Sequence, residues 1–248
     1  MTSLSTPVAE PLARQEGRRD PGAVIEVSEV SVRFSGISAL TDVSLSARPG
    51  EVTGLQQPTS GVVHVEDRDV SKLPPYKRAR LGLARTFQRL EVFGSLTVYE
   101  NVLAAAEFHH AWSDDDTPPR QVAAEIVARV GLSVVAESRV DSLPTGLARL
   151  VELGRALATR PRILLLDEVG SGLNHDETAA LGDLMVELTR DGTAILLVEH
   201  DVELVMRVCD RIFVLDFGRI IAAGTPEQIQ QDAAVQAAYL GAAEEVSA

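Results

Sequence analysis

The sequence has little of several features that define other classes of protein. Its 248 residues include one cysteine, Cys209, so no internal disulfide can form, and a reducing compartment is expected. Aromatic residues make up 4% and hydrophobic residues 45%, so the core must be mostly aliphatic, which suits parallel strands buried on both faces. The net charge is −13, which argues against nucleic-acid backbones and anionic membrane surfaces as direct partners.

The sequence also lacks long apolar runs. No stretch reaches the roughly 18 apolar residues of a membrane span. Residues 1–22 are polar and rich in Pro, Ser, Arg and Glu, and no long apolar stretch follows Arg18 and Arg19. We therefore expect a disordered tail at 1–22 rather than a signal peptide, one folded domain at 23–241, and a second tail at 242–248.

The middle of the chain changes from strand patterns to alternating strands and helices. Residues 24–34, 40–47, 51–55 and 62–66 read as strands, which predicts a β-rich lobe. Beyond residue 74 helices and apolar strands alternate, which predicts a parallel sheet with helices on its faces. The expected helices are 98–109, 121–130, 148–159, 176–190 and 226–240; the expected strands are 163–166 and 194–198, followed by a hairpin of 211–216 and 219–223.

Two carboxylates follow an apolar strand. Asp167 and Glu168 come directly after residues 163–166, which places them at the carboxyl edge of a parallel sheet, where ligands bind. One such acid can hold Mg²⁺ through water, and its neighbour can orient or deprotonate an attacking water. Taken alone, the pair is equally well explained by solubility.

Three further groups of residues suggest a function only when they are considered together. His200 follows the strand at 194–198 and is able to donate to a phosphate at the same sheet edge. Gln88 lies in a loop, where its amide is able to touch Mg²⁺ and the attacking water. Residues 143–146 precede a helix, whose N-terminus is an anion site. Each alone has an ordinary structural reading, and His109 and His110 beside residues 114–116 are better read as a solvated loop than as a metal site.

In this order, these features resemble the ABC ATPase family over residues 24–241. The resemblance implies an α/β protein of the ABC-type P-loop NTPase fold: a mixed core sheet flanked by helices, an antiparallel β lobe, and a helical lobe at about 89–160. It implies ATP and Mg²⁺ as cofactors. The roles that it implies are the Q-loop glutamine for Gln88, signature-motif contacts for Leu143, Thr145 and Gly146, the Walker B aspartate for Asp167, the catalytic glutamate for Glu168, the D-loop for residues 171–174, the switch histidine for His200, and adenine stacking for Phe34.

Two short segments narrow the resemblance. Residues 82–88 (GLARTFQ) and 238–241 (AYLG) are similar to the ATPases of branched-chain amino-acid importers. That resemblance implies a second ABC ATPase subunit and membrane permease subunits as partners, and no nucleic acid. It also implies a cytoplasmic protein held on the inner face of the membrane by its permeases.

The sequence departs from the family where the phosphates should bind. A phosphate loop, G-x-x-x-x-G-K-[ST], is expected after the strand at 51–55, but residues 54–61 read GLQQPTSG and no Lys-Ser or Lys-Thr pair occurs anywhere. The pattern suggests that about twenty residues, the loop and the helix after it, are missing. Losing three charge-assisted hydrogen bonds costs roughly 5–9 kcal/mol, so we expect a defective ATP site. Pro144, where the signature usually has serine, also weakens phosphate contact on that side.

Three interpretations remain open at this stage. The chain is an ATP-hydrolysing importer subunit whose loop is missing, or a non-hydrolysing partner that lends residues 143–146 to an intact ATPase, or a decayed product that folds poorly. Whether it is an enzyme is therefore undecided: the family hydrolyses ATP, and this chain is expected to be inactive alone.

Overall fold

The computed structural model describes residues 22–34, 37–49 and 60–244, apart from the side chains of residues 34, 37, 38 and 239–244. The expected tail at 1–22, except Gly22, and the expected strand at 51–55 lie outside the described residues. Of the expected tail at 242–248, residues 242–244 belong to the last helix and the rest lies outside the description.

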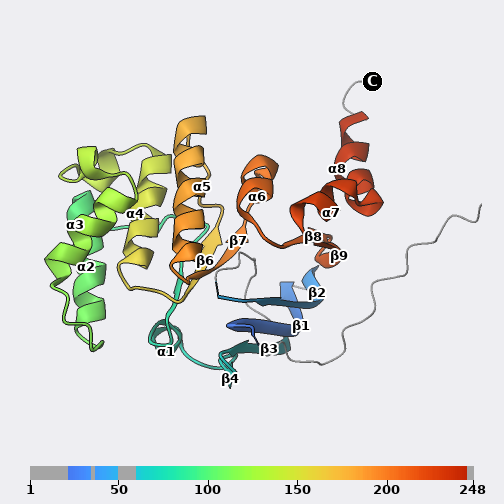
Figure 1. The fold of residues 1–248 in the computed structure, drawn as a ribbon, viewed down its shortest axis with the longest axis horizontal. Helices are drawn as coiled ribbons and strands as arrows, with labels where there is room; N and C mark the ends of the chain where they lie inside the picture. The colour runs from blue at the N-terminus through green and yellow to red at the C-terminus, as the bar shows by residue number, and fades with distance from the viewer. Residues whose placement is uncertain (1–21, 35–36, 50–59, 245–248) are drawn as a thin grey trace, which may run out of the picture.

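The β-rich lobe predicted from the first seventy residues is an antiparallel sheet. It consists of β1 (Ile25–Phe34), β2 (Ile37–Ala47), β3 (Ser60–Val65) and β4 (Arg68–Asp69), in the order β2-β1-β3-β4. Figure 1 shows this sheet in blue and teal below the rest of the fold. Apolar residues that alternate along β1 and β2, among them Val30 and Val43, are fully buried on one face.

A second sheet is parallel and has the order β5-β6-β7. Its strands are β5 (Leu83–Arg85), β6 (Ile163–Asp167) and β7 (Ala194–Val198), as the apolar runs predict for the last two. Side chains of β6 alternate between two cores: Leu164 and Leu166 pack in the cluster formed with the helices, while Ile163 and Leu165 pack toward the antiparallel sheet. The parallel sheet therefore lies between the helices and the antiparallel sheet.

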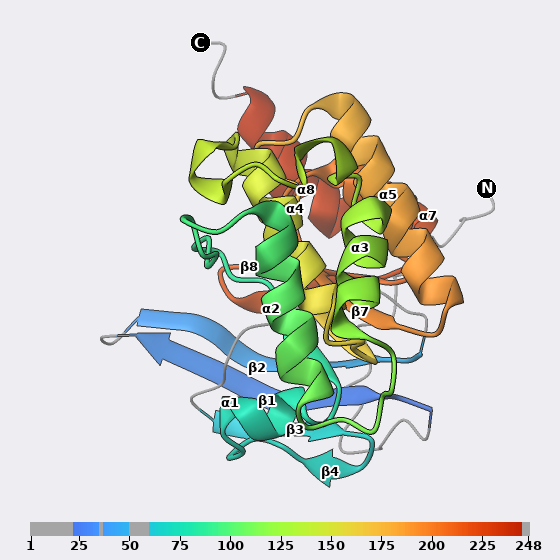
Figure 2. The same cartoon turned by 90° about the vertical axis from the view of Figure 1, so that its left-hand side faces the viewer.

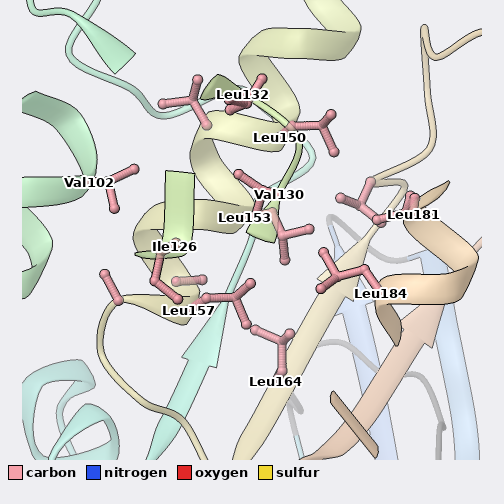
Figure 3. Packing of buried hydrophobic residues seen from close by; sticks show 14 of the residues in the cluster. Val102, Ile126, Val130, Leu132, Leu150, Leu153, Leu157, Leu164, Leu181 and Leu184 are labelled. Atoms are coloured by element: carbon pink, nitrogen blue, oxygen red, sulfur yellow. The ribbon is translucent and has the colours of Figure 1, made fainter. Parts of the chain in front are cut away.

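The helical lobe contains α2 (Val98–His110), α3 (Pro119–Arg129) and α4 (Thr145–Leu157), with 3₁₀ turns at Ser133–Val135 and Val140–Ser142. Thr97 caps α2 through a capping box with Glu100, which fixes its start. Figure 3 shows leucines from α4, β6 and α5 (His175–Arg190) meeting side chains from α2 and α3 in one cluster. Arg129 on α3 also forms ion pairs with Glu187 and Asp191, at the end of α5.

The C-terminal part adds two helices to the same face of the parallel sheet as the helical lobe and then continues into a hairpin. Helix α5 (His175–Arg190) and α6 (Val202–Val208) precede the hairpin of β8 (Ile212–Asp216) and β9 (Arg219–Gly224). The hairpin turns at Phe217 and Gly218, both at positive φ, and a Cβ on Gly218 would lie 2.2 Å from the carbonyl oxygen of Ala39. The turn therefore lies against β2.

The predicted single helix at 226–240 is wrong. The structure has two helices, α7 (Pro226–Gln231) and α8 (Ala233–Glu244). They are separated at Asp232, whose backbone is extended and whose Oδ1 accepts hydrogen bonds from the N–H groups of Ala234 and Val235. The aspartate ends one helix and caps the next.

The sequence did not predict several short elements, among them β4, α1 (Pro75–Ala79), β5 and α6. Figure 2 shows α1 beside the antiparallel sheet, with α2 rising above them. Within the ranges that the structure describes, no helix has both the length and the apolar character needed to cross a bilayer.

Candidate functional site

Hydrogen bonds join the ends of the three parallel strands at one edge of the sheet. Thr86, just after β5, donates its N–H to the carbonyl of Leu165 at 2.9 Å, and its Oγ1 accepts the N–H of Asp167 at 3.1 Å. Glu168 donates its N–H to the carbonyl of Val198 at 2.9 Å. The edge predicted to carry Asp167, Glu168 and His200 therefore exists, with Gln88 two residues beyond Thr86.

The two carboxylates at this edge are half-buried. Burial raises the pKa of Asp167, and the neighbouring Glu168 raises it further, whereas the charges of Arg85 and Arg149 oppose the shift. Glu168 has φ +48°, a left-handed conformation that non-glycine residues rarely adopt. Such conformations cost about 1–3 kcal/mol. Glu168 is one of seven described non-glycine residues with positive φ, and it is the one that lies at this edge of the parallel sheet.

His200 and its neighbour Glu199 have opposite environments. The His200 side chain is 73% exposed, whereas that of Glu199 is 1% exposed. Oε1 of Glu199 accepts the N–H of Gly170 at 2.8 Å, and its Oε2 lies 3.9 Å from His200 Nδ1. Glu199 thus fixes the end of β7 to the loop that follows β6. No role was predicted for Glu199 from the sequence, where its one signal was the position of an acid directly after a buried strand.

The segment that carries Gln88 is held by one face of α4. Glu152 accepts the N–H of Phe87 at 3.1 Å, Arg149 donates to the carbonyl of Gln88 at 3.2 Å, and Arg155 donates to the carbonyl of Glu91. Residues 149, 152 and 155 are three apart and share a helix face. The side chain of Gln88 is exposed. These three contacts were not predicted from the sequence. The signal for them was the spacing of three charged residues on an otherwise apolar helix.

Residues 143–146 form the start of α4. Pro144 is the N-cap and forms no side-chain capping bond, while Leu143 is half-buried and Thr145 is exposed. Gly146 is buried, and a Cβ there would lie 2.4 Å from the carbonyl oxygen of Gly172. The glycine is needed because the loop at 171–174 passes directly over the helix start. These residues therefore contact that loop.

Phe34 is the last residue of β1, and its side chain is not among those described. The segment at 50–59, which precedes β3, also lies outside the described residues.

The residues at the sheet edge fit one part of a magnesium site. Asp167 and Gln88 carry carboxylate and amide oxygens, the kinds of ligand that Mg²⁺ prefers. In the described ranges no group of three or more His, Cys, Asp or Glu residues is arranged to hold a metal ion. A magnesium ion held by Asp167 and Gln88 would therefore need water or phosphate oxygens as its other ligands.

Comparison with known proteins gives consistent results. The family model described as ABC transporter matches residues 41–171, and the model described as branched-chain amino acid ATP-binding cassette transporter matches residues 219–245. Two curated relatives are described as high-affinity branched-chain amino acid transport ATP-binding proteins. BraF of Pseudomonas aeruginosa is 34% identical over 251 residues, and LivG of Escherichia coli K12 is 35% identical over 255 residues. Each match covers 89% of this chain and 98% of the relative.

The fold is also shared with solved structures. The dimeric structure of a bacterial ABC transporter cassette superposes with a TM-score of 0.73 at 23% identity, covering 82% of this chain and 98% of the cassette.

Proposed function

Because the chain belongs to the ABC transporter family of ATP-binding proteins, we propose that it is the ATPase-type subunit of a branched-chain amino-acid importer whose own phosphate site is defective. The observation that carries the proposal is the sheet edge where Thr86 joins the ends of β5 and β6 and Glu168 joins β6 to β7. Nothing in the proposal requires the chain to act alone, and its partners would be a second ATPase subunit and membrane permeases.

The residues at the edge have distinct proposed roles. Asp167 and Gln88 would hold Mg²⁺, which supplies charge neutralisation at the phosphates when bound. Glu168 would orient or deprotonate the attacking water, and His200, exposed beside the buried Glu199, is free to donate to a terminal phosphate. Phe34 would stack on the adenine. Arg85 and Arg149 oppose the rise in the pKa of Asp167, which favours the charged form that a metal requires.

Support for the defect comes first from the sequence. The only lysines are Lys72 and Lys77, and both lie after β4, away from the expected position of the loop between the strand at 51–55 and β3. The match to BraF runs over 251 residues but takes in 89% of the 248 residues here, so the relative has aligned positions with no counterpart in this chain.

A cavity between the two sheets also supports the defect. It has a volume of about 530 Å³ and is lined by apolar residues of both sheets, including Val27, Val63, Leu165 and Leu196. The space is open to solvent, since Phe87, Phe93 and Phe108 in its lining are exposed. A missing helix next to β3 would account for an unfilled space of this kind.

A second candidate is the non-hydrolysing partner that lends Leu143, Thr145 and Gly146 to an intact subunit. The observation in its favour is the N-terminus of α4, where the N-cap Pro144 makes no side-chain capping bond. First-turn N–H groups without a side-chain acceptor are available to an anion.

Calorimetry tests the main proposal. ATP with Mg²⁺ is titrated into the chain as it is, into a version with a consensus phosphate loop and its helix inserted after Leu55, and into that version with the loop lysine replaced by alanine. We expect binding only to the repaired version that has the lysine. Micromolar binding by the original chain would overturn the defect, and no binding by any version would overturn the assignment of the edge as an ATP site.

Mixing tests the second candidate. The chain is added to an intact ATPase of a branched-chain amino-acid importer, and complex formation is followed by size-exclusion chromatography while phosphate release is measured. The partner role predicts a mixed dimer with about half of the intact dimer's sites active. The absence of a complex, or loss of all hydrolysis in it, would contradict that role.

A further inference from the structure

The cavity between the sheets has the size and lining of a ligand site. At about 530 Å³ it falls within the range of small-molecule pockets, about 300–1,000 Å³. Its walls come from β1, β3, β5, β6 and β7 and from α1, α2 and α4, so it is formed by elements distant in sequence. Most of its lining is aliphatic or alanine, including Ala104 and Ala105 of α2 and Ala156 of α4.

One end of the cavity is basic. Arg78 lines it, donates from Nη2 to the carbonyl of Ser71 at 3.0 Å, and has a buried Nε with no hydrogen-bond partner. Among the described side chains no carboxylate lies within ion-pair distance of Arg78. Residues 72–80 hold four basic residues and no acid, in a chain whose net charge is −13.

The acids of the cavity are already engaged elsewhere. Glu152 accepts the N–H of Phe87. Burial lowers the pKa of Arg155, and the negative charges of Glu152 and Glu91 oppose that lowering. Arg155 in turn donates to the carbonyl of Glu91 and stacks on Phe93, with 4.5 Å from Cζ to the ring centroid. Arg85, which also lines the cavity, donates from Nε to the carbonyl of Thr86 and stacks on Phe87. Among the described residues, Arg78 is therefore the lining arginine that has neither an aromatic ring nor a carboxylate as its partner.

We propose that this cavity binds an amphiphilic carboxylate, with an apolar chain of about a dozen carbons between the sheets and its anionic head on Arg78. At about 30 Å³ per heavy atom, such a molecule occupies about 400 Å³ and fits the space. Because the Nε of Arg78 is buried, the carboxylate would pair with the terminal N–H groups of the planar guanidinium. The proposal does not depend on the chain binding ATP.

The first test compares head groups on the unmodified chain. Dodecanoate, dodecanol and dodecyltrimethylammonium, each below its micelle concentration, are titrated by calorimetry. We expect saturable one-to-one binding of dodecanoate, and at least tenfold weaker binding of the cation. No saturable binding, or equal affinity for the three head groups, would overturn the proposal.

The second test uses matched variants whose folding is checked by thermal melting. Arg78→Met should weaken dodecanoate binding about tenfold or more, because a charge-assisted hydrogen bond is lost. Arg80→Met, which removes an arginine that does not line the cavity, should change it less than threefold. Equal losses in the two variants would contradict a specific head-group site.

The third test fills the cavity. Ala104→Leu adds three carbons inside it and should weaken binding several-fold, while Ala124→Leu on the exposed face of α3 should leave binding unchanged. Undiminished binding by Ala104→Leu would place the ligand elsewhere and overturn the proposal. Sedimentation with phosphatidylglycerol vesicles identifies the source: Arg78-dependent pelleting indicates an acyl chain from a bilayer, and its absence indicates the free amphiphile.

Discussion

Oε1 of Glu152 accepts the backbone N–H of Phe87 at 3.1 Å, across 65 residues of sequence. Glu152 is 5% exposed and is one of three buried polar residues in the described part of the chain. Burial raises the pKa of Glu152, while the N–H groups of Phe87 and Glu91 and the charges of Arg149 and Arg155 lower it. The hydrogen bond therefore joins the Gln88 segment to α4 through a carboxylate that has little contact with water.

Replacing this carboxylate tests the connection. Glu152→Ala leaves the N–H of Phe87 without its acceptor and should lower the free energy of unfolding by about 1–3 kcal/mol. Glu152→Gln keeps an acceptor and should cost less than about 1 kcal/mol. Urea unfolding measures both. Equal losses in the two variants would mean that packing rather than the hydrogen bond matters at this position.

Asp167 should make stability depend on pH. Because its pKa in the folded state is raised above the ordinary value of 3.8, the folded state binds the proton more tightly than the unfolded state. Its contribution to stability is therefore greatest below 3.8 and falls as the pH rises through the folded pKa. Asp167→Asn removes this loss and should be more stable than the original chain at neutral pH.

Urea unfolding at several pH values from below 3.8 to neutrality checks the Asp167 prediction. Asp114→Asn, which removes the same charge from an exposed position, serves as the control. A difference between Asp167→Asn and the original chain that stays constant with pH would show that the carboxylate is not destabilised by burial.

The sequence predicted the parts of the fold that have strong local patterns. The continuous apolar runs ending at Asp167 and Val198 are strands, and the acids that follow them do meet at one edge. The roles of Glu152 and Glu199 were not visible, because a carboxylate is buried only by partners far away in sequence. The break at Asp232 was missed because its flanking glutamines and alanines favour helix on both sides. Strand β5 was missed because three residues carry no period.

Gly146 should tolerate no side chain. The Cβ of alanine there would lie 2.4 Å from the carbonyl oxygen of Gly172, so the 171–174 loop has to move. Gly146→Ala should cost about 1–3 kcal/mol in thermal or urea unfolding, as overpacking usually does. Gly94→Ala is the matched control, since its Cβ would only reach ordinary contact with Asp141, at 3.4 Å. Similar costs for the two variants would contradict the close approach of the loop.

Two adjacent leucines of β6 should differ in their contribution to stability. Leu164 is 0% exposed in the helical core, whereas Leu165 is half-buried and lines the cavity. Leu164→Ala should cost about 3–5 kcal/mol, and Leu165→Ala about 1–2 kcal/mol, because fewer contacts are lost beside an existing space. Urea unfolding of both variants checks this. Equal costs would mean that the space between the sheets is filled in solution.

Cys209 should react slowly. Burial raises the pKa of its thiol to about 12, and the charge of Asp210 contributes to the rise. Since the thiolate is the reactive form, a disulfide reagent at mildly alkaline pH should modify the folded chain far more slowly than the chain in urea. As the chain has a single cysteine, the absorbance change reports this residue alone. Equal rates in the two conditions would show that the thiol is accessible.

Strand β6 contributes side chains both to the core beneath the helices and to the packing against the antiparallel sheet. Its amide protons are therefore released to solvent only when both halves of the molecule open. The antiparallel sheet is separated from α2 and α4 by the cavity, and it is free to detach without disturbing Leu164 or Leu166. We therefore expect hydrogen exchange in two steps of different free energy. The amides of the antiparallel sheet should exchange in the first step, and those of β6, which is packed on both faces, in the second.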